Sequence, residues 1–219
     1  MISARALAGA RFALAISVVA ILLTGCATSV APSASPTTTA TPSPTGTPTV
    51  YHSVNFADPL TVSLFPSLDP NPLEDSPGLL TWQESGNDVN RIRFLIPAKV
   101  YGQRGEFPVL DYTAYIQTLR SQGGILSHKG TVTVAGKTVP IVTVNEPGGT
   151  DGSIGCSAED APQHDPDHCF AYGPDYSIRV VTLKVNGKTF VAWARTSPDK
   201  YDTRFNALFE RMLQTLSFG

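Results

Sequence analysis

The sequence has no excess of positive charge. Its 219 residues contain 16 Lys and Arg against 18 Asp and Glu, and the formal net charge is −2. No basic face is evident in the sequence, which argues against a nucleic-acid partner. Acidic residues are absent before Cys26, whereas Arg5 and Arg11 lie in that segment. A positive, acid-free start of this kind is typical of a targeting signal.

The first apolar run, residues 12–23, is short for a membrane span, which needs about 20 apolar residues. It has the length of the hydrophobic region of a signal peptide, and it ends in Leu23-Thr24-Gly25-Cys26. This tetrapeptide resembles the bacterial lipobox, in which an apolar residue and two small residues precede an acceptor cysteine. The resemblance implies that residues 1–25 are removed and that Cys26 carries lipid. The mature chain would then be lipid-anchored on the extracytoplasmic face of the cell membrane. The alternative is a membrane helix that ends in a cysteine by chance.

Residues 27–50 lack charged and aromatic side chains and consist almost entirely of Ala, Pro, Ser and Thr. Such a segment cannot bury enough apolar surface to offset its ordering entropy. We expect residues 26–50 to form a lipidated, disordered linker. Residues 51–219 are long enough for one globular domain with its own core.

Cysteine is scarce, with three residues in the chain. Lipidation would consume Cys26 and leave Cys156 and Cys169 in an oxidising compartment. We predict a disulfide between them, closing a loop of about 14 residues and contributing about 3 kcal/mol in the chain-entropy model.

The apolar pattern of the domain predicts strands and two helices. Residues 60–65, 79–84 and 90–101 are expected as strands, and residues 110–122 as a helix with Asp111 as N-cap. Two hairpins follow, over 131–144 and 176–195, the second around Asn186-Gly187. Pro140 places its strand at an edge or a bulge.

A last helix is expected after Ser197 as N-cap, with Pro198 in its first turn. Its apolar stripe is made by Phe205, Leu208, Phe209, Met212, Leu213 and Leu216. In the second hairpin, Ile178 and Val180 alternate with Val181, Leu183 and Val185, so both faces of that strand should be covered. We therefore predict an α+β fold, with an antiparallel β-sheet packed between helices.

The element order from about residue 110 to the end resembles the PsbP-like fold of small actinobacterial lipoproteins of the LpqN type. The shared features are a helix ending at Gly123-Gly124, the two hairpins and the closing amphipathic helix. The resemblance implies an α/β/α sandwich with a binding or accessory role, and it supplies no catalytic residue. The acidic segment around Cys156–Cys169 departs from that pattern.

The acidic loop, residues 151–168, is the main candidate for a ligand site. Its imidazoles and carboxylates suit a divalent metal ion, and the candidate ligands are His164, Asp165, Asp167 and His168. Pro166 argues against the helix that would place both imidazoles on one face. The simpler interpretation is a solvated acidic loop held by a structural disulfide, with no cofactor.

Three apparent catalytic motifs fail on spacing or context. Gly130 to Thr138 has five residues between its glycines, where a phosphate-binding loop has four, and it falls on a hairpin. Ser197-Pro198-Asp199-Lys200 lacks the Lys-Thr-Gly partner of a penicillin-binding nucleophile. Ser153 lies outside any Gly-x-Ser-x-Gly motif.

The sequence therefore predicts a membrane-anchored, non-enzymatic binding or accessory lipoprotein. Its partners would be the membrane, through the lipid, and an envelope protein or a small ligand. The first alternative is an envelope lipoprotein that binds a metal or small ligand through the acidic loop. The second is an envelope hydrolase.

Overall fold

The computed structural model describes residues 46–219, apart from residues 103–104, 109–111, 113–114, 116–124, 146–151, 164, 172–175 and 198–201. The chain divides into two units, Met1–Ala40 and Thr41–Gly219, and every described residue belongs to the second. The predicted signal peptide and Cys26 lie outside the described residues. The first strand includes Thr49 and Val50, which the sequence had placed in the linker.

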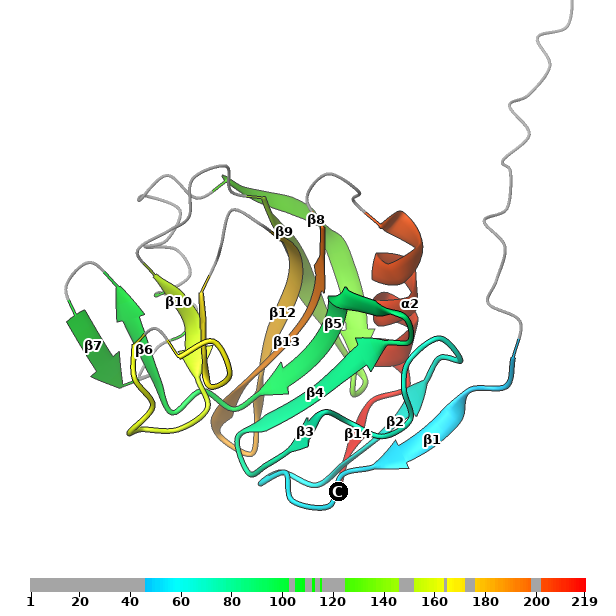
Figure 1. The fold of residues 1–219 in the computed structure, drawn as a ribbon, viewed down its shortest axis with the longest axis horizontal. Coiled ribbons are helices and arrows are strands. Elements are labelled where there is room, and N and C mark those ends of the chain that lie inside the picture. The colour runs from blue at the N-terminus through cyan, green and yellow to red at the C-terminus, as the bar shows by residue number, and fades with distance from the viewer. Residues whose placement is uncertain are drawn as a thin grey trace, which may run out of the picture. The chain divides into compact units, whose positions relative to one another are not determined.

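A seven-stranded antiparallel sheet forms the centre of the second unit (Figure 1). Two of its hairpins have two-residue turns, Ala135-Gly136 in one and Asn186-Gly187 in the other. All four of these residues have positive φ. That conformation matches the twist of the flanking strands. In sheet order the strands are β3 (Glu74–Asp75), β4 (Leu79–Glu84), β5 (Asn87–Leu95), β13 (Lys188–Thr196), β12 (Ser177–Val185), β9 (Lys137–Asn145) and β8 (Ile125–Val134).

Two smaller antiparallel sheets accompany the central one. The first joins the two ends of the unit, in the order β1 (Thr49–His52), β2 (Leu60–Leu64) and β14 (Ser217–Phe218). The second has the order β11 (Cys169–Ala171), β10 (Ser153–Cys156), β6 (Lys99–Gly102) and β7 (Gly105–Pro108).

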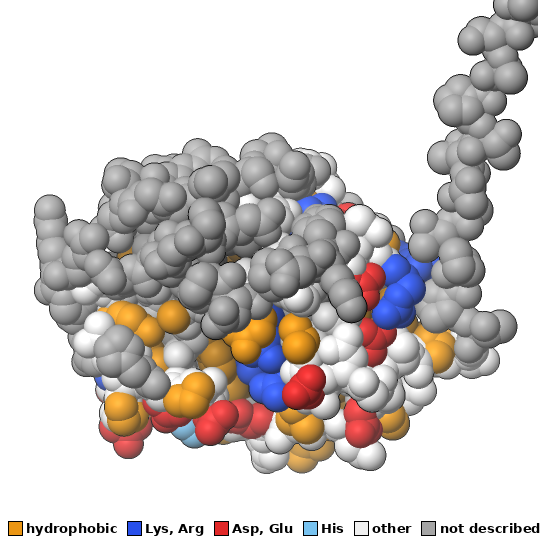
Figure 2. Space-filling model, turned by 45° about the horizontal axis from the view of Figure 1, so that its top comes forward, with side chains coloured by type: hydrophobic (Ala, Val, Ile, Leu, Met, Phe, Trp, Pro, Cys, Tyr) orange, Lys and Arg blue, Asp and Glu red, His pale blue; other side chains and the backbone are white. Residues whose placement is uncertain are grey.

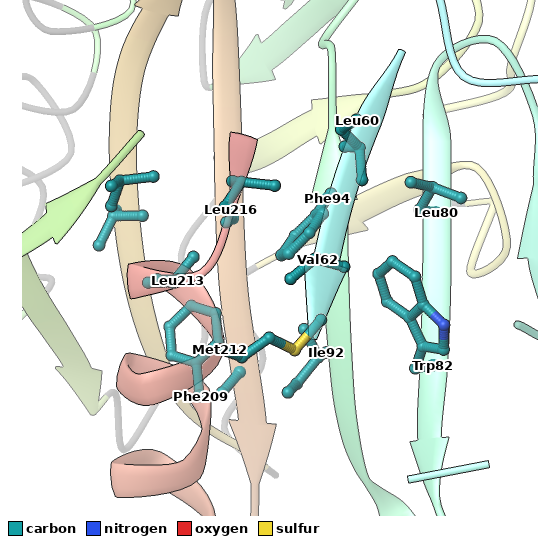
Figure 3. Close-up of a cluster of buried hydrophobic side chains, with 14 of the residues drawn as sticks. Leu60, Val62, Leu80, Trp82, Ile92, Phe94, Phe209, Met212, Leu213 and Leu216 are labelled. Atoms are coloured by element: carbon teal, nitrogen blue, oxygen red, sulfur yellow. The ribbon is translucent and has the colours of Figure 1, made fainter. Parts of the chain in front are cut away.

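Helix α2 (Thr203–Gln214) packs on one face of the central sheet, opposite the side occupied by β6, β7 and β10 (Figure 1). The predicted apolar stripe is confirmed, since all six of its residues are buried. Phe209, Met212 and Leu213 point toward Ile92 and Phe94 of β5, and Val62 of β2 lies beside them (Figure 3). Val181, Leu183 and Val185 belong to the same cluster, as their alternation predicted.

The opposite face of the central sheet is covered by a second cluster. Ile178 and Val180 of β12 pack there with Trp193 of β13. Their partners include Ile154 of β10 and Phe170 of β11, together with Tyr112 and Tyr115. The second small sheet therefore supplies much of the cover on this side.

The predicted α+β sandwich, with a sheet packed between helices, is wrong. The protein is mostly β, with three antiparallel sheets and one helix described along its length. The alternating apolar side chains of β12 correctly indicated that both faces of the sheet are buried. They do not specify which elements pack on each face. Strands as short as β10 and β11 leave little periodic signal. Tyr112 and Tyr115 have helical backbone, and the rest of the predicted 110–122 helix, with Asp111, lies outside the described residues.

Several element boundaries also differ from the prediction. Asp202, rather than Ser197, caps α2, because its carboxylate accepts a hydrogen bond from the Phe205 N–H. The predicted strand 90–101 is divided into β5 and β6. Pro140 lies in β9, which is not an edge strand, and it pairs with Thr131 of β8; the β8–β9 ladder has a register shift close by, between His128 and Gly130. The pairing of β9 with β12 ends at Ile141, so the missing N–H of Pro140 is tolerated.

In the part of the chain that the structure describes, no helix combines the length and apolar character needed to cross a membrane. The apolar run of the sequence, residues 12–23, lies outside the described residues.

Candidate functional site

A pocket of about 300 Å³ opens where the second small sheet meets the central sheet. We call it the arginine pocket. Strands β5, β13 and β12 form one side, and β6, β10 and β11 form the other. Its described lining residues are Arg93, Tyr101, Ile154, Pro166, Cys169, Phe170, Ala171, Tyr176, Ile178, Trp193 and Arg195.

Arg93 is the central side chain of this pocket. It lies in the middle of the sheet, directly opposite Thr81 of β4 and Trp193 of β13. Only 5% of its surface is exposed. Its buried Nε has no hydrogen-bond partner, and the guanidinium forms no hydrogen bond or ion pair with any residue the structure describes. Arg93 is therefore a buried cation whose donors are unused.

Aromatic rings hold the two arginines of the pocket. The guanidinium carbon of Arg93 lies 4.6 Å from the centroid of the Phe170 ring and 5.9 Å from that of Trp193. The guanidinium carbon of Arg195 lies 4.1 Å from the centroid of Tyr176. Such cation–π contacts stabilise the charged guanidinium.

Arg195 differs from Arg93 in that its donors are partly used. Its Nε donates to the carbonyl oxygen of Val89 at 3.0 Å, and its Nη2 donates to that of Asp88 at 3.2 Å. The Arg195 side chain is therefore oriented by the backbone of β5, while Arg93 keeps its full set of donors.

The pocket has an electrostatic surplus of positive charge. Arg91 and Arg195 are direct cross-strand partners, an arrangement that places like charges side by side. Burial, followed by the charges of Arg195 and Arg91, lowers the pKa of Arg93 to about 9. Glu74 opposes that shift from two strands away, but its carboxylate accepts a hydrogen bond from Ser76 and forms no ion pair with Arg93. Burial also lowers the pKa of Arg195.

Figure 2 shows one face of the molecule on which Lys and Arg side chains lie directly beside hydrophobic ones, with acidic side chains along the adjoining rim. The face combines the two properties found in the lining of the arginine pocket, positive charge and apolar surface.

The predicted disulfide between Cys156 and Cys169 is confirmed, and it joins directly paired residues of β10 and β11. It positions one wall of the pocket, because Cys169 lines it and Phe170 comes next in the chain. Tyr101 lies with both cysteines in a third small buried cluster.

The predicted metal candidates do not form a cluster among the described residues, where no group of three or more His, Cys, Asp or Glu side chains converges. Asp165 instead organises a turn, its carboxylate accepting from the Asp167 N–H at 2.9 Å. The Nδ1 of His168 lies 3.4 Å from the Ser157 hydroxyl, and both His168 and Asp167 are exposed. His164 lies outside the described residues.

Ser153, considered for the hydrolase alternative, is fully buried. Its Oγ accepts a hydrogen bond from the Tyr101 N–H at 3.0 Å, and its backbone exchanges hydrogen bonds with the Tyr115 hydroxyl. These contacts tie β10 to β6 and to Tyr115, which is a structural role.

The arginine cluster was not among the sites predicted from the sequence. Arg91 and Arg93 are two residues apart on one strand, and Trp193 and Arg195 on another, so each pair shares a face. That spacing is visible in the sequence. What brings the pairs together is the register of β5 against β13, between segments about a hundred residues apart.

No known protein family matches this sequence, and no curated protein matches it. Among solved structures, the chain shows a weak resemblance to the crystal structure of LpqN, described as involved in cell envelope biogenesis of Mycobacterium tuberculosis. The TM-score is 0.25 at 12% sequence identity, over 80% of this chain and 85% of that chain. A resemblance at this level establishes neither fold nor function.

Proposed function

We propose that this protein is an extracytoplasmic lipoprotein, anchored at the cell membrane through Cys26, whose globular part is a non-enzymatic binding module for a small anion. The lipobox-like tetrapeptide supports the location. The observation that carries the binding role is Arg93, a buried guanidinium with no described partner at the wall of a 300 Å³ pocket.

The physical argument concerns the cost of burying a charge. A buried ionised group is strongly unfavourable unless hydrogen bonds or an opposite charge compensate it. Buried polar groups in native proteins are nearly always satisfied, so an exception calls for an explanation. An anion bound in the pocket would supply both the charge and the acceptors that Arg93 lacks.

The described lining suits binding better than catalysis. Guanidinium groups and aromatic rings orient a ligand, but they do not exchange protons with it near neutral pH. Burial raises the pKa of Tyr101, which keeps its hydroxyl protonated there. This chemistry supports a receptor or carrier role in the envelope, with a ligand small enough to enter the pocket.

The anchor is tested by changing Cys26→Ala in the full chain and following the protein in membrane and soluble fractions after labelling with an alkyne-bearing palmitate analogue. We expect the parent to carry the label and sediment with membranes, and the variant to lose the label. An unlabelled parent would overturn the lipid anchor.

The binding role is tested by measuring the melting temperature of the full, detergent-solubilised chain against a panel of organic and inorganic anions. We expect at least one anion to raise the melting temperature of the parent and leave Arg93→Gln unchanged. Lys137→Gln is the matched control, because it removes one positive charge at the exposed β8–β9 turn, away from the pocket. A panel without any Arg93-dependent shift would overturn the binding role.

A further inference from the structure

The head group of the ligand is defined by the donors that the pocket leaves unused. The Arg93 guanidinium lies over the Phe170 ring, and no residue the structure describes accepts a hydrogen bond from the N–H groups at its edge. Such an edge presents donors in a planar fork, the geometry that a carboxylate accepts in a bidentate manner. Arg195 already donates to two backbone carbonyls. Of the two arginines that line the pocket, Arg93 is the one without a described acceptor, and its single positive charge matches one negative charge.

The body of the ligand is defined by the rest of the lining. Apart from the two arginines, the described lining is apolar or aromatic, and it contains no carboxylate side chain. The apolar and aromatic surface that stays accessible in the pocket belongs to Pro166, Ala171 and Tyr176, whereas Ile154, Ile178 and Trp193 lie almost fully buried beneath it. An inorganic anion would contact Arg93 and leave this apolar surface against water. A ligand with an apolar body would cover it and gain the hydrophobic contribution.

The size of the ligand follows from the volume of the pocket. A pocket of about 300 Å³ corresponds to roughly ten water molecules at liquid density. This lies at the lower end of the range for small-molecule sites. It accommodates a body of one or two rings, or a short branched chain, together with the head group.

On these grounds, and resting on the proposed function, we infer that the arginine pocket binds an organic monocarboxylate with a compact apolar body, its carboxylate paired with Arg93. The carboxylate of the ligand would lie among the positive charges of Arg91, Arg93 and Arg195. Its apolar body would fill the pocket between the two sheets.

The test is isothermal titration calorimetry of the full chain in a nonionic detergent, using a matched set of probes. 2-Naphthoate supplies both the carboxylate and the two-ring body. 2-Naphthamide keeps the body and lacks the charge, and sodium acetate and sodium phosphate keep a charge and lack the body. Because each probe partitions into the detergent equally with every variant, differences between variants report the protein alone.

We expect 2-naphthoate to bind the parent at least tenfold more tightly than 2-naphthamide, acetate or phosphate. Arg93→Gln should reduce its affinity at least tenfold, and Arg93→Lys, which keeps the charge without the planar fork, should give an intermediate loss. Lys137→Gln should bind as the parent does. The comparison of probes on the parent chain does not depend on the folding of the Arg93 variants, provided that each free concentration is corrected for the partition of that probe into the detergent.

The alternative outcomes separate the two proposals. Tight binding of phosphate or acetate that depends on Arg93 would overturn the monocarboxylate class and leave the anion-binding function standing. Equal binding of 2-naphthoate and 2-naphthamide would overturn recognition through Arg93. The absence of any Arg93-dependent anion in the panel would overturn the proposed function itself.

Discussion

Arg93 of the central sheet and Phe170 of the second small sheet meet with the guanidinium carbon 4.6 Å from the ring centroid. The two residues lie in strands that share no hydrogen bond, so their contact joins the two sheets. The pocket therefore exists only when both sheets are in place. Anything that loosens β11 should act on the site as well as on stability.

The disulfide is the first place to examine this dependence. The double variant Cys156→Ser, Cys169→Ser should lower the free energy of unfolding by about 3 kcal/mol, because the unfolded chain regains the freedom of the closed loop. It should also weaken binding of 2-naphthoate, since Phe170 follows Cys169 directly. Urea unfolding and calorimetry measure the two effects. Full affinity in a stable double variant would show that the loop does not position the pocket.

Arg93→Met should separate stability from binding. The change removes a buried, unpaired charge and keeps an apolar stem of similar length, so we expect the free energy of unfolding to rise by about 1 kcal/mol. Binding of 2-naphthoate should be lost. Thermal and urea unfolding of the ligand-free chain check the first expectation. A destabilised variant would mean that the contact with Phe170 outweighs the cost of burying the charge.

Anion affinity should fall as the pH rises through 9. Burial and the charges of Arg195 and Arg91 lower the pKa of Arg93 to about 9, against the opposing effects of Glu74 and Tyr176. The charged form that binds an anion is therefore complete at pH 7 and is lost above 9. Titrations with 2-naphthoate at pH 7, 8, 9 and 10 check this, with uncharged 2-naphthamide as the pH-independent control.

The lowered pKa of Arg93 also determines the direction in which the free energy of unfolding changes with pH. The folded chain releases the Arg93 proton at a lower pH than the unfolded chain does, so the unfolded state binds more protons above pH 9. The unfavourable contribution of Arg93 is present below pH 9 and is relieved as the pH rises beyond it. The difference in unfolding free energy between the parent and Arg93→Met should therefore narrow between pH 8 and 10.

Asp202→Ala should destabilise the protein by about 1–2 kcal/mol, because it leaves the Phe205 N–H at the start of α2 without its cap. Asp202 also accepts a hydrogen bond from Asn90 at 3.2 Å. Ser197→Ala, at the position the sequence favoured as the cap, should stay within about 0.5 kcal/mol of the parent. Urea unfolding of the two variants side by side decides between the two residues.

The parts of the fold that were predicted correctly depend on patterns within short segments. The Asn186-Gly187 turn, the stripe of α2 and the two-sided alternation of β12 each lie within about twenty residues. The short strands that cover the face of Ile178 and Val180 beside Tyr112 and Tyr115 were not predicted, because they have only three or four residues. Asp202 was missed because Ser197-Pro198 is the commoner signature of a helix start.

The candidate site could be predicted only in fragments. The disulfide followed from cysteine count and compartment, and it proved to form one wall of the pocket. The pairs Arg91–Arg93 and Trp193–Arg195 have a spacing that indicates a shared face, yet an isolated strand gives no sign of its neighbour. The pocket arises from the pairing of β5 with β13 and from the packing of Phe170 over both, and these contacts are long-range.

The pairing of β14 with β2 links the last residues of the chain to its first strands, with Ser217 opposite Thr61 and Phe218 opposite Leu60. The first small sheet therefore cannot be completed until Ser217 and Phe218 are available to pair with β2. For a protein that is exported across a membrane, as proposed for this one, the order in which its segments arrive matters. The first small sheet closes only after Ser217 and Phe218 have reached the outer side, and a chain that stops before them lacks the strand that completes this sheet.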